Sequence, residues 1–122
     1  MRKYLYAMMS TIAVSMAVAT PAQAYFYNAS DLLDGAREVL RHNQGGQINN
    51  YQDAAKFRTY AVAIYDVAEL EGLICSPRGT MVGQASALTA NWIVNNPQDW
   101  SRPAANVVFE ALLHHFPCVD QE

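Results

Sequence analysis

The sequence predicts an all-α fold, a small helical bundle of about four helices with one disulfide. Four segments repeat apolar residues at spacings of three and four, which is the period of a helix, and none alternates as a strand does. Short connections rich in Gly, Pro and Asn separate these segments, which is typical of a bundle. The chain also holds two cysteines, an even number.

The N-terminus predicts export rather than structure. Two basic residues precede an uncharged apolar run over residues 4–19, and an A-x-A cleavage site ends at Ala24. We therefore expect residues 1–24 to be a cleaved signal peptide and residues 25–122 to form a single domain. An uncleaved membrane anchor is the alternative, although the run is shorter than the about 20 apolar residues that a spanning helix needs.

The first two predicted helices have clear apolar faces. The first spans residues 31–42, with Asn28 or Ser30 as its cap, because their side chains can accept from first-turn amides. Its apolar stripe is Leu32, Leu33, Ala36, Val39 and Leu40. The second helix spans residues 51–70, and Gly72 is a candidate for the C′ position after it. Its apolar face is Ala54, Phe57, Ala61, Ile64 and Ala68.

The third and fourth predicted helices are joined by an Asn-Pro loop. The third spans residues 80–95, with Thr80 as a candidate cap. Its expected face is Met81, Ala85, Leu88 and Trp92. The fourth begins after Ser101, with Pro103 inside its first turn, and Pro117 stops it. Its expected face is Ala104, Val107, Val108, Ala111, Leu112 and His115.

The two cysteines bracket the third and fourth helices. Cys75 lies in a Cys-x-Pro turn just before the third helix, and Cys118 lies just past the end of the fourth. In an exported chain this favours a disulfide between Cys75 and Cys118. Closing a loop of about 43 residues is worth about 4 kcal/mol in the chain-entropy model. Two buried free thiols are the alternative.

The charge balance excludes some partner classes. The chain has 11 Asp and Glu against 8 Lys and Arg, and removal of Arg2 and Lys3 with the signal peptide takes its formal net charge from −3 to −5. An acidic domain without a basic cluster is a poor partner for nucleic acid or an anionic membrane surface. It suits a basic protein partner.

No residue set predicts catalysis, a metal or a cofactor. His114 and His115 are neighbours on a helix and point about 100° apart, so they cannot easily share a metal ion. A solvated helix end is their expected environment. Glu69 and Glu71 diverge in the same way, and the serines lack the glycines of a nucleophile elbow. We therefore expect a protein that is not an enzyme.

The connection from Asn95 to Arg102 is the candidate for partner binding. It places a tryptophan in a short polar loop, and Trp and Arg are enriched in binding hot spots. The candidate contact residues are Asn95, Asn96, Gln98, Asp99, Trp100 and Arg102. The alternative is that Trp100 folds back onto the core as a lid, because Trp is mostly buried in proteins. Residues 43–50 form a second exposed loop, whose glycines indicate mobility more than recognition.

An ordered set of motifs runs from Cys75 to Cys118. In order, it consists of Cys-x-Pro, Gly79-Thr80-x-x-Gly83-Gln84, Asn96-Pro97, Ala104-Ala105 and Phe116-Pro117-Cys118. With the segment NASDLL at residues 28–33, this set resembles the Rap/Tai family of type VI secretion amidase immunity proteins. Many members carry two further cysteines, at the places that Ala36 and Phe57 hold here, so one disulfide of that pattern is missing.

The resemblance implies an all-α periplasmic immunity protein that acts as a homodimer. Such proteins bind a secreted peptidoglycan amidase effector and block its active-site cleft with a loop, without turnover or a cofactor of their own. The many apolar residues in so small a domain also favour an exposed apolar patch and a symmetric dimer. A periplasmic acid-stress chaperone is the alternative, and an amidase gene next door or the oligomeric states at pH 7 and pH 3 discriminate the two.

Overall fold

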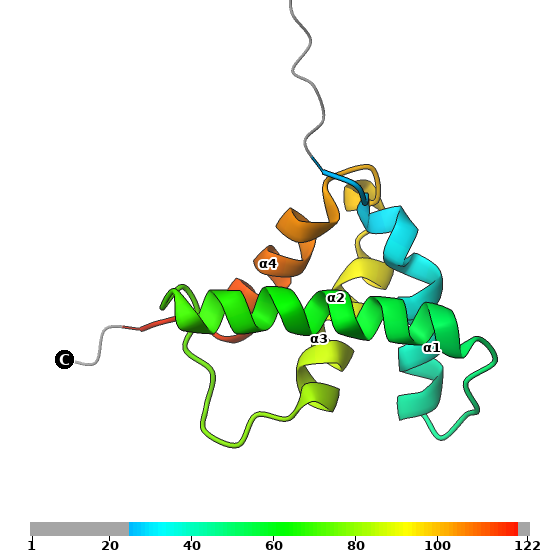
Figure 1. The fold of residues 1–122 in the computed structure, drawn as a ribbon, viewed down its shortest axis with the longest axis horizontal. Helices are drawn as coiled ribbons and strands as arrows, with labels where there is room; N and C mark the ends of the chain where they lie inside the picture. The colour runs from blue at the N-terminus through cyan, green and yellow to red at the C-terminus, as the bar shows by residue number, and fades with distance from the viewer. Residues whose placement is uncertain (1–24, 120–122) are drawn as a thin grey trace, which may run out of the picture.

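A computed structural model describes residues 25–119, which form four α-helices and two short 3-10 helices (Figure 1). The elements are η1 (Ala29–Leu32), α1 (Leu33–Asn43), α2 (Tyr51–Leu70), α3 (Val82–Asn95), η2 (Pro97–Asp99) and α4 (Ala104–His115). The described residues contain no strand, only an isolated bridge between Asn28 and Pro103. The all-α prediction is confirmed. The predicted signal peptide lies outside the described residues, and within them no helix has the length and apolarity to cross a membrane.

Helix α2 runs across the other three helices (Figure 1). Both α2 and α3 contact each of the remaining α-helices, so they form the centre of the bundle. Phe57 of α2 is fully buried at this centre. The other large side chains buried there are Leu32, Val39, Ile74, Ile93, Val107, Val108 and Leu112.

The predicted faces of α1 and α2 are confirmed. All of their members are buried except Leu40 and Ile64, which are half-buried. The two helices approach so closely at Gly35 that a Cβ there would lie 2.2 Å from the backbone oxygen of Asp53 and 2.6 Å from Cβ of Phe57. A glycine is therefore required at this helix crossing.

The predicted face of α3 is confirmed except at Met81, but it is incomplete. Ala85 is buried and the half-buried Leu88 and Trp92 pack against the core, whereas Met81 is 66% exposed. The fully buried residues of α3 are Ala85, Ser86, Thr89, Ala90 and Ile93. Small side chains turn inward because α3 must approach three helices at once. The hydroxyl of Thr89 donates to the backbone oxygen of Ala85 at 2.8 Å, so burial leaves it hydrogen-bonded.

Three end assignments also differ from the prediction. Thr80 does not cap α3, because its hydroxyl donates to the oxygen of Pro77 at 2.7 Å, and Met81 holds the N-cap position. Pro103 precedes the first turn of α4 as its N-cap instead of lying inside it. His115 has the spacing of the apolar face of α4 but is exposed in the last turn of the helix, so the solvated helix end expected for it is confirmed and its place on the apolar face is not.

The connection from α2 to α3 is fixed at several points. Gly72 adopts φ +67° and donates to the oxygen of Glu69 at 3.0 Å, and Leu73 donates to that of Ala68 at 2.8 Å. This is a Schellman motif, which confirms Gly72 at C′. The predicted disulfide is also confirmed, since Cys75 and Cys118 are bonded with their Cα atoms 4.8 Å apart. The two ends of the α3–α4 hairpin are thereby joined.

Candidate functional site

Trp100 anchors the loop from Asn95 to Arg102 to the core. Its indole N–H donates to the backbone oxygen of Ile93 at 2.8 Å, and its half-buried ring packs against the core. The guanidinium of Arg37 lies over the Trp100 ring, 5.9 Å from its centroid. This geometry favours the lid interpretation for Trp100 over that of a free hot spot.

Arg102 fixes the other end of the loop. Its guanidinium pairs with both carboxylate oxygens of Glu110, one of them at 2.8 Å, and with Asp99 at 3.1 Å. Bidentate pairing of this kind is strong and geometrically specific. The Arg102 guanidinium lowers the pKa of the Glu110 carboxyl, and Glu110 and Asp99 raise the pKa of Arg102. Asp99 and Arg102 therefore already have partners within the domain.

The N-terminal segment braces the loop from its other side. The amides of Ala29 and Ser30 donate to the backbone oxygens of Arg102 and Trp100, each at 2.9 Å. The amide of Ala104 donates to the oxygen of Tyr27 at 2.9 Å. Three backbone hydrogen bonds thus hold the shape of the loop before any partner arrives.

An uncharged polar edge remains on the outside of the loop. Asn95, Pro97, Gln98 and Ser101 are exposed, whereas Asn96 is half-buried. The side chains of this edge are linked to one another, since the amide of Gln98 donates to Asn96 Oδ1 at 3.0 Å. The six predicted contact residues are therefore together in one loop, but they divide into an outer edge and an inner support.

A polar hollow of about 210 Å³ adjoins this edge, between α3 and α4. Asn95 belongs to both the loop and the hollow. His114 lies tilted against Trp92 with ring centroids 5.0 Å apart, and His115 lies edge-on to the same indole at 6.2 Å. Both histidines are exposed, as expected for a helix end, but their shared contact with Trp92 has no signal in the sequence.

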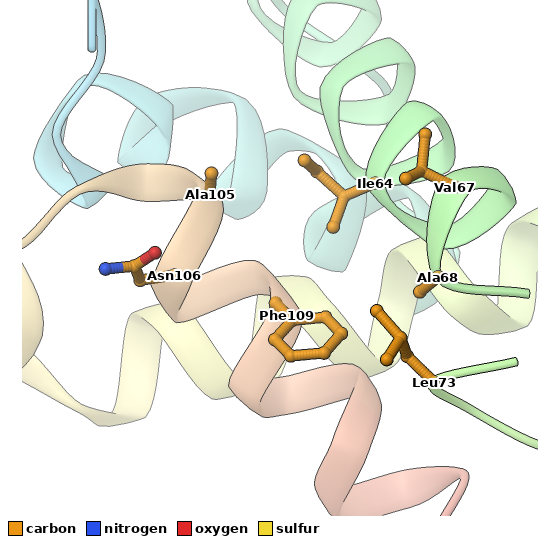
Figure 2. A pocket seen from close by; sticks show the side chains of 7 residues that line it. All are labelled: Ile64, Val67, Ala68, Leu73, Ala105, Asn106 and Phe109. Carbon is orange, nitrogen blue, oxygen red and sulfur yellow. The ribbon is translucent and has the colours of Figure 1, made fainter. Parts of the chain in front are cut away.

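An open apolar groove of about 290 Å³ lies between α2 and α4 (Figure 2). The side chains of Phe109 and Leu73 point toward each other across it, and Asn106 lies at its edge. The remaining lining residues are Ile64, Val67, Ala68 and Ala105. Val67 is 58% exposed and Leu73 is 49% exposed, and no lining residue is charged. The groove matches the exposed apolar patch that the composition predicts.

The described residues hold no group of three or more His, Cys, Asp or Glu side chains that could bind a metal ion. A family model described as Rap1a immunity proteins matches residues 28–118 of the chain. The match begins at the residue before η1 and ends at the second cysteine of the disulfide, so it includes every described helix. No curated protein and no solved structure matches the chain.

Proposed function

The chain belongs to the family of Rap1a immunity proteins, and from this premise we propose that it binds and inhibits a type VI secretion peptidoglycan amidase in the periplasm. Membership in an immunity family implies a toxic effector as the partner. The amidase as the target, and the periplasm as the place of action, rest on the resemblance to the Rap/Tai family and on the predicted signal peptide.

The braced loop from Asn95 to Arg102 is the observation that carries this proposal. An inhibitor that blocks a cleft needs a protruding segment that keeps its shape, because ordering a flexible segment on binding costs free energy. Trp100, Arg102 and the N-terminal backbone supply that rigidity here. The outer edge, led by Asn95 and Gln98, then contacts the walls of the enzyme cleft and excludes the substrate.

Paired substitutions test the loop. We expect Gln98→Arg to weaken inhibition of the cognate amidase by about tenfold or more, since a misplaced charge at a packed interface costs at least about 1.4 kcal/mol. Gln47→Arg, in the exposed loop between α1 and α2, is the matched control. Release of peptidoglycan stem peptides measures inhibition, and thermal melting confirms that both variants fold. Equal inhibition by the two variants would remove the loop from the contact surface.

We propose further that the apolar groove between α2 and α4 is the face of a symmetric homodimer. Two copies carry the same negative charge, so they meet most favourably through an uncharged surface, and the lining of this groove has no charged residue. A groove on each copy also offers the self-complementary surface that a two-fold interface needs.

Sedimentation at tens of micromolar tests the dimer. Val67→Glu places a charge in the groove, and we expect it to give monomers. Ala55→Glu changes an exposed position about three turns earlier on the same helix, away from the groove, and it should leave the dimer intact. A wild-type protein that sediments as a monomer would refute the dimer, and a dimeric Val67→Glu variant would refute this face.

A periplasmic acid-stress chaperone remains the second candidate, favoured by the same exposed groove. Such a protein would open in acid to expose more apolar surface, and several carboxylates of this domain are held in hydrogen bonds that protonation would break. Suppression of client aggregation at pH 3, together with no inhibition of any amidase at pH 7, would favour it.

A further inference from the structure

The hollow beside the loop differs in chemistry from the rest of this acidic domain. It is formed by the C-terminal half of α3, the start of the loop and the end of α4. Its lining contains two histidines, three asparagines, a tryptophan and a leucine, but no Asp or Glu. The chain has 11 acidic residues, but none of them lines this hollow. An anion that enters the hollow therefore meets no carboxylate of the lining.

The hydrogen bonds within the hollow already occupy two of its three asparagine side-chain oxygens as acceptors. The side-chain oxygen of Asn91 already accepts from Asn95 at 3.2 Å, and that of Asn96 accepts from Gln98 at 3.0 Å. The indole N–H of Trp92 is buried without a hydrogen-bond partner among the described residues. An indole can only donate, so this group lacks an acceptor.

The imidazoles are held in place at the mouth of this hollow. The ring centroids of His114 and His115 lie 5.0 Å apart, and both rings contact the indole of Trp92. Nδ1 of His115 lies 2.8 Å from the backbone oxygen of Ala111, to which it donates. A ligand therefore meets rings whose positions are already fixed, which lowers the ordering cost of binding.

We propose that this hollow binds a carboxylate, namely an Asp or Glu side chain of the effector that flanks the cleft entered by the loop. A carboxylate is an acceptor with about four lone-pair sites, and its hydrogen bonds are roughly twice as strong as neutral ones. A cationic side chain would find no carboxylate here to pair with. This inference rests on the proposed function, because Asn95 joins the hollow to the loop and makes them one contact surface.

A pair of isosteric probes tests the chemistry without any effector. In a nitrogen-15 NMR titration, millimolar N-acetyl-glutamate methylamide should shift the indole N–H signal of Trp92 and the side-chain amide signal of Asn91. N-acetyl-glutamine methylamide should shift neither. The indole of Trp100 is an internal reference, because it is bonded to Ile93. Shifts that are absent, or equal for both probes, would overturn the proposal.

A peptidoglycan stem peptide, which also carries carboxylates, is the second probe. If it binds at least tenfold more tightly than the glutamate probe, the ligand is the substrate and the assignment to an effector side chain is wrong. Equal or weaker binding supports the effector. Both results are readable whether or not an amidase partner has been found.

Charge reversal then tests the pocket in the complex. We expect His114→Glu to weaken binding of the cognate amidase by about tenfold, because two carboxylates would face each other. His114→Gln, which keeps a donor, should cost less. His42→Glu is the matched control, since His42 is also exposed in the last turn of another helix. If His114→Glu and His42→Glu bind alike, the pocket has no role in the complex. If the glutamate probe binds but no amidase does, the proposed function is wrong and the hollow remains a carboxylate-binding site.

Discussion

The connections before and after α3 are held by different means. The α2–α3 connection is fixed covalently at Cys75 and by the end of α2, where the carboxylate of Glu69 accepts from the amide of Ser76 at 2.9 Å. The α3–α4 loop has no covalent bond and depends on Trp100, Arg102 and the N-terminal backbone. The first is therefore suited to resist unfolding, and the second to present a surface.

Removal of the disulfide is expected to have the largest effect. Cys75→Ser or Cys118→Ser should lower the free energy of unfolding by about 4 kcal/mol, the value for a closed loop of this length. Urea unfolding measures the loss, and mass spectrometry of the exported protein checks that the wild type has no free thiol. A loss well below about 2 kcal/mol would show that the hydrogen bonds alone hold the α2–α3 connection.

Removal of Trp100, which anchors the α3–α4 loop, is expected to have the next largest effect. Trp100→Ala should cost about 3 kcal/mol of stability, the lower end for a large aromatic ring, because the side chain is only half-buried. Trp100→Phe, which keeps a ring and loses only the bond to Ile93, should cost less. Melting temperature and amidase inhibition are measured together. Lost inhibition with an unchanged melting temperature would instead make Trp100 a contact residue.

The ion pairs of Arg102 should contribute less to stability than the Trp100 side chain does. Arg102→Met keeps the aliphatic stem and removes the charge, and we expect a smaller loss of stability than in Trp100→Ala because the side chains of Arg102 and Glu110 are 38% and 41% exposed. Hydrogen exchange at the Trp100 indole should become faster in this variant. If the Trp100 indole N–H exchanges at the wild-type rate in this variant, the hydrogen bonds from the N-terminal backbone are sufficient to hold the loop.

Acid should loosen the two connections by a smaller amount. Hydrogen bonds from Ser76 lower the pKa of Glu69, so its contribution to stability is present above the ordinary carboxyl pKa and is lost as the pH falls through the lowered value. Glu69→Gln should therefore flatten the acid side of the stability profile between pH 7 and pH 3. Glu110→Gln is the counterpart for the loop, since Arg102 lowers the pKa of Glu110. Unchanged profiles in both variants would contradict these assignments.

The features that could be predicted from sequence are those encoded within a few residues. The helices, the glycine after α2 and the cysteine pair each have a local pattern, and all three are confirmed. The small buried residues of α3 could not be predicted in this way, because apolar Met81 and Leu88 outweigh Ser86 and Ala90 in any count of periodicity. Burial there follows close helix packing, which favours small side chains.

The internal roles of the loop residues depend on distant partners. The pair of Arg102 and Glu110 crosses from the loop to α4, and the brace of the loop comes from residues 27–30, about seventy positions earlier in the chain. The contact between Trp92 and His114 likewise joins two helices, α3 and α4. No spacing rule within one segment reports such contacts.

The N-terminal brace has a consequence for the order in which the domain assembles. If the chain is exported, as its N-terminus predicts, residues 27–30 leave the translocation channel well before the loop that they hold. The loop can take its final shape only when almost the whole domain has passed through. An immunity protein built in this way would stay inactive during export and become competent once the far end of the chain returns to its beginning.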